Sequence, residues 1–423
     1  MGECRNPRNN TSPALMPQLP STIPDDSQRT VRRSRDAFVI LNLFLLLFLG
    51  LADNQTIPAL LPLLVKSLGI NIEQAGLLAV FYSLSAAAAA MVTGPLSDHF
   101  GRRRFLVAGA GLFAVASWFA SRTHGLTELT VARAVTGLAA GTISTCSIAM
   151  AGDWFPYQVR GRAVGLISVA YFAAPILGVP IGAEVAQHFG WRRTFVIFGA
   201  FALAVTAASL MLPREEPKRA LPIGRLRQTL RSCRTFLRRR DTAAGLVIAF
   251  LVSGGLYTFI YYIGQWLSVA FDVNTRTIGE VFMLGGVVAV GSAPLGGFLS
   301  DRWGKRSVSI GGDLVLAFSV ALVPYLPWGV SLLVVFGTAS LGAAFRQGPL
   351  TALMTELVPS EERGAFVALR NVFSQVGIGT MVFAGGVLYQ WRGYGAVTAL
   401  CAVMTALVAL LLVTHIVEPR AGQ

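Results

Sequence analysis

The sequence predicts an all-α integral membrane protein with twelve transmembrane helices arranged as two parallel-repeat six-helix bundles. First, 54% of its 423 residues are hydrophobic and 13% are charged, and the mean hydropathy of +0.60 is too high for a water-exposed surface. Second, uncharged stretches of about 20 residues, long enough to cross a bilayer as helices, recur after Ala37. Third, the second half of the chain repeats the first. Continuous apolar runs such as 38–51 also exclude the alternating pattern of a membrane β-barrel.

The first 36 residues are polar and contain five prolines. We expect residues 1–36 to form a disordered cytoplasmic tail rather than a cleaved signal peptide, with the first span acting as its own insertion signal. Four arginines between positions 29 and 35 precede that span, and basic residues beside a span stay in the cytoplasm.

Apolar stretches separated by glycine, proline or charged turns predict the twelve helices. They cover 37–62, 73–98, 103–121, 126–151, 162–187, 192–212, 242–268, 277–300, 306–323, 329–354, 365–390 and 394–415. Lysine and arginine concentrate in alternate loops, which places these loops and both termini in the cytoplasm. We therefore expect a multi-pass protein of the plasma or inner membrane, ending in a cytoplasmic tail at 416–423.

A basic segment at 213–241 separates the sixth and seventh predicted helices. Its Leu226, Leu230, Cys233 and Leu237 lie at helical spacing, with seven arginines around them. This pattern predicts an amphipathic helix at 223–240 on the anionic inner leaflet, and a solvated charged linker is the alternative. Either structure makes the segment the boundary between a first bundle at 37–212 and a second at 242–415.

The two halves match at a single offset. Asp98 and Asp301 are separated by 203 residues (301 − 98 = 203). The same offset relates Gly101 to Gly304, Pro156 to Pro359, Arg160 to Arg363 and Gly190 to Gly393. Because six spans are an even number, the second half re-enters from the same side and the repeats are parallel. This arrangement predicts two halves that rock around a site between them.

The most conspicuous repeated motif is GPLSDHFGRRR at 94–104, with GGFLSDRWGKR at 296–306. A glycine one helical turn before the aspartate permits close backbone approach, and the later glycine permits a tight turn. The basic residues that follow can pair with this aspartate or with an acid at the end of the fourth or tenth helix. The predicted gate comprises Gly94, Asp98, Gly101, Arg102, Arg103, Asp153, Gly297, Asp301, Gly304, Lys305, Arg306 and Glu356. A turn carrying only topogenic charges is the alternative, and two matched copies argue against it.

These motifs resemble the major facilitator superfamily, whose signature G-x-x-x-D-x-x-G-R-R lies between helices 2 and 3 and recurs in the second half. LTVARAVTGLAAG (129–141) is similar to the family's R-x-x-x-G pattern, and 153–165 and 175–195 also resemble family segments. The fifth helix departs from the antiporter pattern G-P-x-x-G-G, because Pro180 stands one place later. The resemblance implies a secondary transporter but weakens a specific antiporter assignment.

Two charges lie deep within the predicted spans, where each costs roughly 2.5–3.5 kcal/mol on insertion scales. Asp53 in the first helix and Arg133 in the fourth reach similar depths, so we expect them to pair. Making and breaking this pair could bind and release a proton, and a purely structural ion pair is the alternative. The segment 52–62 also resembles a first-helix pattern of drug exporters that begins with aspartate and ends with proline.

The resemblance implies that helices 1, 4, 7 and 10 line the cavity. Besides Asp53 and Arg133, its predicted wall residues are Asn42, Gln55, Tyr257, Tyr261, Gln265, Trp266, Arg346 and Gln347. We expect Arg346 to face the cavity or to pair with an acid, and Asp313 to pair with Arg370 at matching depth. The 203-offset partners of Asp53 and Arg133 are Leu256 and Phe336, so we expect the first half to couple to the ion.

No nucleotide-binding or metalloprotease motif is present, and the histidines and cysteines lack metal-ligand spacing. We therefore expect no enzymatic activity, cofactor, metal or nucleic-acid partner. The sequence favours a monomeric transporter that couples proton entry to export of a drug-like or amphiphilic compound. A carrier of an anionic metabolite or sugar is the first alternative, and a non-transporting receptor or scaffold with this fold is the second.

Overall fold

The computed structural model describes residue 2 and residues 26–214, 234–359 and 362–416. In these ranges twelve helices are long and apolar enough to cross a membrane, and each predicted span overlaps one of them. The chain divides into two compact units, Met1–Val39 and Ile40–Gln423, and everything argued below belongs to the second. The predicted tails and amphipathic segment fall largely on residues outside the described ranges.

The first six spans precede the segment 215–233. They are α1 (Asp26–Leu68), α2 (Ile72–Phe100), α3 (Arg102–Ala120), α4 (Leu126–Trp154), the broken span α5 (Tyr157–Ser168), α6 (Ala170–Ala173) and α7 (Val179–Phe189), and α8 (Trp191–Ser209). A π-helical turn, Ala174–Gly178, joins α6 to α7 and contains Pro175. Proline has no amide hydrogen to donate, so regular α-helical bonding is interrupted there.

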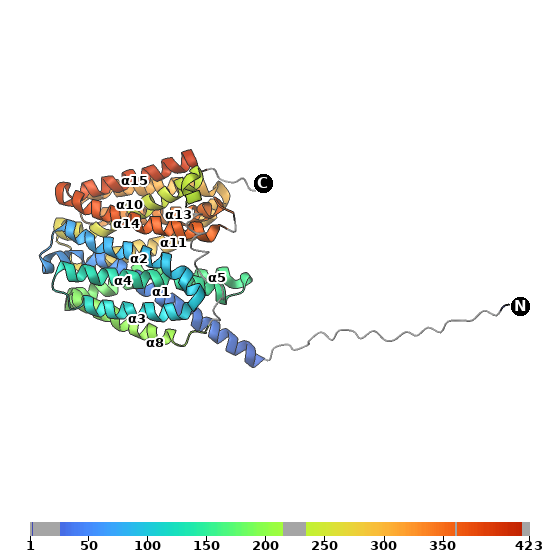
Figure 1. Ribbon diagram of the computed structural model, residues 1–423. Coiled ribbons are helices and arrows are strands. Elements are labelled where there is room, and N and C mark those ends of the chain that lie inside the picture. The colour runs from blue at the N-terminus through green and yellow to red at the C-terminus, as the bar shows by residue number, and fades with distance from the viewer. Residues whose placement is uncertain (1, 3–25, 215–233, 360–361, 417–423) are drawn as a thin grey trace. The chain divides into compact units, whose positions relative to one another are not determined.

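The last six spans are single helices, and residues 234–416 that contain them are referred to as the second half. They are α10 (Arg240–Phe271), α11 (Thr275–Trp303), α12 (Lys305–Leu322, continued by a 3-10 turn at Val323–Tyr325), α13 (Val330–Glu356), α14 (Arg363–Arg392) and α15 (Tyr394–His415). In Figure 1 α10, α13, α14 and α15, coloured yellow-green to red, gather together, as do α1, α2, α3, α4 and α8 in blue to green. The predicted bundle boundaries stay a prediction.

The repeat seen in the sequence recurs in the backbone. α2 and α11 begin 203 residues apart (275 − 72 = 203), as do α3 and α12 (305 − 102 = 203). Asn71 and Asn274 cap the starts of α2 and α11 by accepting a hydrogen bond from the amide three residues later. Gly101 and Gly304 have φ values of 89° and 87°, a conformation that favours glycine, so the predicted tight turns are confirmed.

Close backbone approach occurs elsewhere than the motif predicted. A Cβ atom on Gly94 would meet only Thr145 at 3.7 Å, and one on Gly297 would meet nothing within 4 Å. A Cβ on Gly141 of α4 would instead lie 2.3 Å from the carbonyl oxygen of Ala86 in α2. The expectation for Gly94 and Gly297 is therefore wrong in this conformation. Gly141 makes the close approach in the first half, and in the second half Gly296 does so, because its Cβ would lie 3.0 Å from the Cα of Phe345 in α13.

We name the helix ends that carry the Gly101 and Gly304 turns the motif end, and the opposite ends the far end. The two halves are joined at the far end, where α2 packs on α14 and α7 on α11. Tyr261 donates a hydrogen bond to the carbonyl of Ala75 (2.9 Å), and Arg276 lies 3.4 Å from Glu184. One hydrophobic core also includes residues of both halves there. The far end is thus closed.

Candidate functional site

Asp53 and Arg133 form a buried ion pair within the first half. Each is 1% exposed, and Arg133 donates a hydrogen bond from Nη1 to Asp53 Oδ2. A second guanidinium nitrogen donates to Asn54 Oδ1 at 3.3 Å, and the guanidinium carbon lies 4.4 Å from the ring centroid of Tyr82. The expected pairing is therefore confirmed, while its role in proton coupling stays a prediction.

This pair is incompletely satisfied. Asp53 Oδ1 and Arg133 Nε are buried, and neither makes a hydrogen bond to a described residue. Buried polar atoms without partners are uncommon, so each one calls for an explanation. Asp53 thus has one buried carboxylate oxygen that Arg133 does not engage.

The second half has its own buried ion pair. Arg346 of α13 donates from Nη1 to Asp313 Oδ1 of α12 at 2.9 Å, and both side chains are at most 1% exposed. A Cβ on Gly312 would lie 2.8 Å from the carbonyl oxygen of Gly342, so α12 and α13 are close enough for the short aspartate to reach the arginine. The predicted Asp313–Arg370 pair is therefore wrong. Arg346 was expected either to face the cavity or to pair with an acid, and it pairs with an acid.

This pair also changes the expected asymmetry between the halves. The offset partners of Asp53 and Arg133 are apolar, as the sequence shows, yet the second half carries buried charges at other positions. A sequence signal existed: Gly312 directly precedes Asp313, and Gly342 lies one turn before Arg346, so two small residues flank the two charges.

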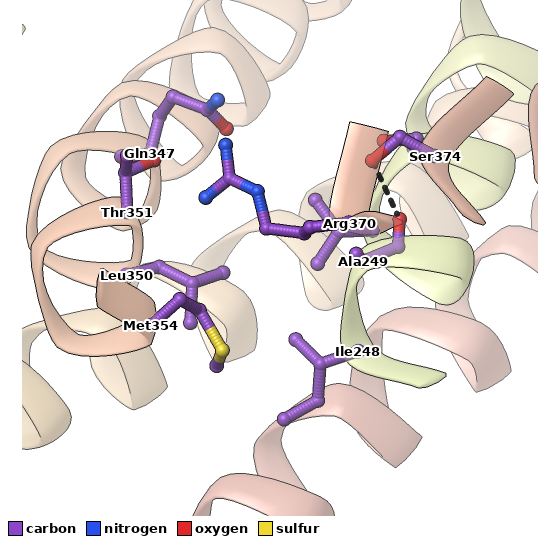
Figure 2. Close-up of a pocket in the computed structure, with 10 residues that line it drawn as sticks. Ile248, Ala249, Gln347, Leu350, Thr351, Met354, Arg370 and Ser374 are labelled. Carbon is purple, nitrogen blue, oxygen red and sulfur yellow. Dashed lines mark hydrogen bonds between the residues drawn. The ribbon is translucent and has the colours of Figure 1, made fainter. Parts of the chain in front are cut away.

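A cavity of about 350 Å³, counting space open to solvent, lies between α10, α13 and α14 towards the motif end. Its walls are Ile248, Ala249, Val252, Ser253, Gln347, Leu350, Thr351, Met354, Arg370 and Ser374. Figure 2 shows the Arg370 guanidinium directed towards the Gln347 amide, while Ser374 donates a hydrogen bond to the Ala249 carbonyl (3.4 Å). Of the predicted wall residues, Gln347 lines this cavity. Arg370 was missed, although its one-turn spacing from Ser374 marks a polar face of α14.

Several other predicted wall residues face neighbouring helices. Asn42 accepts a hydrogen bond from Ser209 of α8 at 3.0 Å. Trp266 stacks on Tyr394 of α15, with ring centroids 5.0 Å apart, and Tyr261 joins the halves at the far end. The resemblance assigns whole helices to the cavity, but only one face of each helix can line it. Gln55, Tyr257 and Gln265 are half-buried, as a wall residue would be.

The first copy of the repeated motif forms a network of ion pairs. Arg102 donates to Asp98, to Asp153 (2.6 Å) and to Ser97 (3.1 Å), and its side chain is 10% exposed. It thereby ties the end of α2 to the end of α4. Arg103 donates to the carbonyl of Leu210, beyond the end of α8.

The second copy contains a more exposed ion pair. Lys305 pairs with Glu356, and these side chains are 29% and 33% exposed. Arg306 donates to the carbonyls of Leu412 (2.9 Å) and Val413 (2.6 Å). Asp301 is exposed and forms no ion pair with a described residue. The motif is thus duplicated in sequence, and the ion pairs described for its first copy are centred on the more buried basic side chain.

Comparison with known proteins identifies the family to which this architecture belongs. The family model described as Major Facilitator Superfamily matches residues 43–337 and 245–423. An uncharacterised MFS-type transporter of Bacillus subtilis (strain 168), YbcL, is 25% identical over 375 residues, covering 86% of this chain and 93% of the relative. A probable L-galactonate transporter of Escherichia coli (strain K12) is 20% identical, covering 98% and 97%.

A solved structure agrees. The crystal structure of a D-xylose–proton symporter superposes with a TM-score of 0.73 at 19% identity, covering 90% of this chain and 98% of that one. The family consists of secondary transporters of small molecules rather than enzymes, as expected from the sequence. With a family match along nearly all its spans and twelve helices in this fold, the chain belongs to the major facilitator superfamily, a multi-pass transporter of the cell membrane.

Proposed function

We propose that this protein exports a small amphiphilic compound by alternating access, driven by proton entry, with Asp53 as the proton site. The buried Asp53–Arg133 pair carries this proposal. A charge left alone in a bilayer is costly, so Asp53 stays ionised while Arg133 neutralises it. When a movement of the halves or a bound solute draws Arg133 away, protonation of Asp53 removes the free-energy cost of its unpaired charge. Proton binding and conformation are thereby linked.

The arrangement of the halves supports alternating access. They meet at the far end, whereas the cavity lies towards the motif end. The positive-inside rule favours a cytoplasmic location for the basic motif end, and with this orientation we infer a state open to the inside. Export would begin with capture of the solute from this side. The opposite state requires the far-end contacts to part and the motif ends to approach.

Proton-driven flux into reconstituted vesicles tests this function. A panel of lipophilic cations, organic anions and sugars is added to proteoliposomes that contain a pH-sensitive dye. We expect at least one compound to provoke proton movement, and an imposed pH gradient to accumulate that compound. A compound that equilibrates without regard to the gradient would show uniport. One that binds but never crosses would favour a receptor or scaffold.

The unequal motif networks give a prediction about the gate. Arg102→Gln breaks a partly buried network, whereas Lys305→Gln breaks a pair with Glu356 that is more exposed. Charged hydrogen bonds contribute about 1.5–3 kcal/mol and exposed ion pairs about 0–1 kcal/mol. We expect Arg102→Gln to depopulate the inside-open state roughly tenfold or more, and Lys305→Gln less than about fivefold.

Thiol labelling of the cavity measures this shift. Thr351→Cys, in a chain whose four native cysteines are replaced by serine, places a reactive group in the cavity wall. The rate of labelling by a membrane-impermeant reagent reports how often the cavity is open. Equal slowing by the two substitutions would mean that both motif copies hold the state equally.

A further inference from the structure

Three arginines lie well inside the membrane-spanning helices of the cavity region, and two are neutralised. Arg133 pairs with Asp53, and Arg346 with Asp313. Arg370 lies seven residues into α14, about 10 Å from its start, and forms no ion pair with any described residue. A cation at depth in a membrane protein is costly and faces a partner or a water-filled space. Arg370 faces the cavity instead of an acid of the described chain, so its charge is accessible to an anion that enters from solution.

The surroundings of Arg370 suit an anion that also carries apolar groups. The ten residues that line its cavity include no acid. The amide of Gln347 stands across from the guanidinium in Figure 2, while Ile248, Leu350 and Met354 contribute apolar side chains to the same cavity. Guanidinium groups bind carboxylates, sulfonates and phosphates through paired hydrogen bonds. The apolar surface would contact the remainder of such a molecule.

Arg370 also lies within electrostatic range of the first half. Tyr171 of α6 lies within electrostatic range of Arg370, and 51% of this residue is exposed. Tyr257 of α10 is within range of Tyr171, and Tyr82 of α2 is within range of both Tyr257 and Arg133. Tyrosines of both halves therefore lie in the region between Arg370 and the Asp53–Arg133 pair.

We propose that Arg370, with Gln347, binds the acidic group of the transported solute, which makes the substrate an amphiphilic organic acid. This inference rests on the proposed transport function and names its substrate class. It replaces the sequence-based reason for an anionic substrate, which relied on Arg133 and Arg346, because both of these arginines have acids of their own. An anionic lipid headgroup offers the same chemistry, so the test separates free acids from lipids.

Binding to the full-length protein in nanodiscs tests the proposal without a pH gradient. The probes are 1-naphthalenesulfonate and dodecanoate, each matched to a neutral alcohol and an ammonium compound with the same apolar group. A ligand that binds the folded state raises the melting temperature. We expect the acids to stabilise the protein more than their matches do, and Arg370→Gln to weaken their binding roughly 10- to 100-fold. Arg370→Lys should recover part of the affinity.

The control removes a charge from the same helix. Arg363 is an exposed cation at the start of α14 and does not line the cavity. Arg363→Gln should therefore leave acid binding unchanged. Should Arg370→Gln fail to fold, Gln347→Leu at the exposed opposite wall replaces it, with an expected loss of roughly fivefold. Equal binding by wild type and Arg370→Gln, or by acids and their neutral matches, overturns the proposal.

Nanodiscs of phosphatidylcholine, with and without phosphatidylglycerol, form the lipid arm. If only the anionic lipid stabilises the protein through Arg370, the site holds a headgroup and the proposal is overturned. Because binding is measured without a proton gradient, its failure leaves proton-coupled export standing. Conversely, acid binding without gradient-driven accumulation would reject the proposed function alone.

Discussion

Asp53→Asn is expected to reduce gradient-driven accumulation of the substrate to the level of protein-free vesicles while downhill exchange persists. Asparagine has nearly the shape of aspartate, and its oxygen can still accept the hydrogen bond from Arg133. It cannot bind and release a proton, so the link between the pH gradient and the movement of the halves is lost. Accumulation and exchange are measured in the same proteoliposomes.

The control for this substitution is another acid. Glu128→Gln removes an exposed carboxylate from the first turn of α4, the helix that carries Arg133, and should leave accumulation unchanged. Asp53→Asn also leaves the Arg133 charge buried without a counter-charge, so a second variant, Asp53→Asn with Arg133→Gln, restores neutrality. Uphill transport that survives in either Asp53 variant would remove Asp53 from the coupling mechanism.

The second large effect is expected on stability. Asp313→Ala leaves Arg346 buried and unpaired, and breaking a buried pair in this way costs about 3–5 kcal/mol. Replacing both residues, as Asp313→Ala with Arg346→Met, removes both charges and keeps an apolar side chain of similar length. The double variant should recover most of the stability, because apolar replacement of a buried ion pair is often neutral or stabilising by about 1–4 kcal/mol.

A double-mutant cycle measures this coupling. The apparent melting temperatures of wild type, both single variants and the double variant are compared in one detergent. Additive effects of the two substitutions would show that the pair contributes no coupling energy. Transport by the double variant then separates two roles. A stable double variant with normal flux would make the pair structural, and a stable one without flux would place it in the transport cycle.

The pairing of Asp53 with Arg133 was predictable because both charges are rare within apolar spans and lie at similar depth. Depth alone failed for Asp313, which lies level with Arg370 yet pairs with Arg346. The rotation of α12 and the close approach allowed by Gly312 decide that choice. Depth along a helix follows from sequence position, but the direction in which a side chain points depends on packing.

The sequence by itself determined the twelve spans, the parallel repeat, the glycine turns and the family. Each follows from local rules: lipid requires helices whose backbone polar groups are satisfied internally, and glycine alone takes positive φ readily. Only the tertiary structure decided that the far end is closed, that Arg346 is neutralised and that Arg370 faces the cavity. These facts depend on how helices distant in sequence rotate and approach one another, because the partner of a buried charge is chosen by contacts between helices.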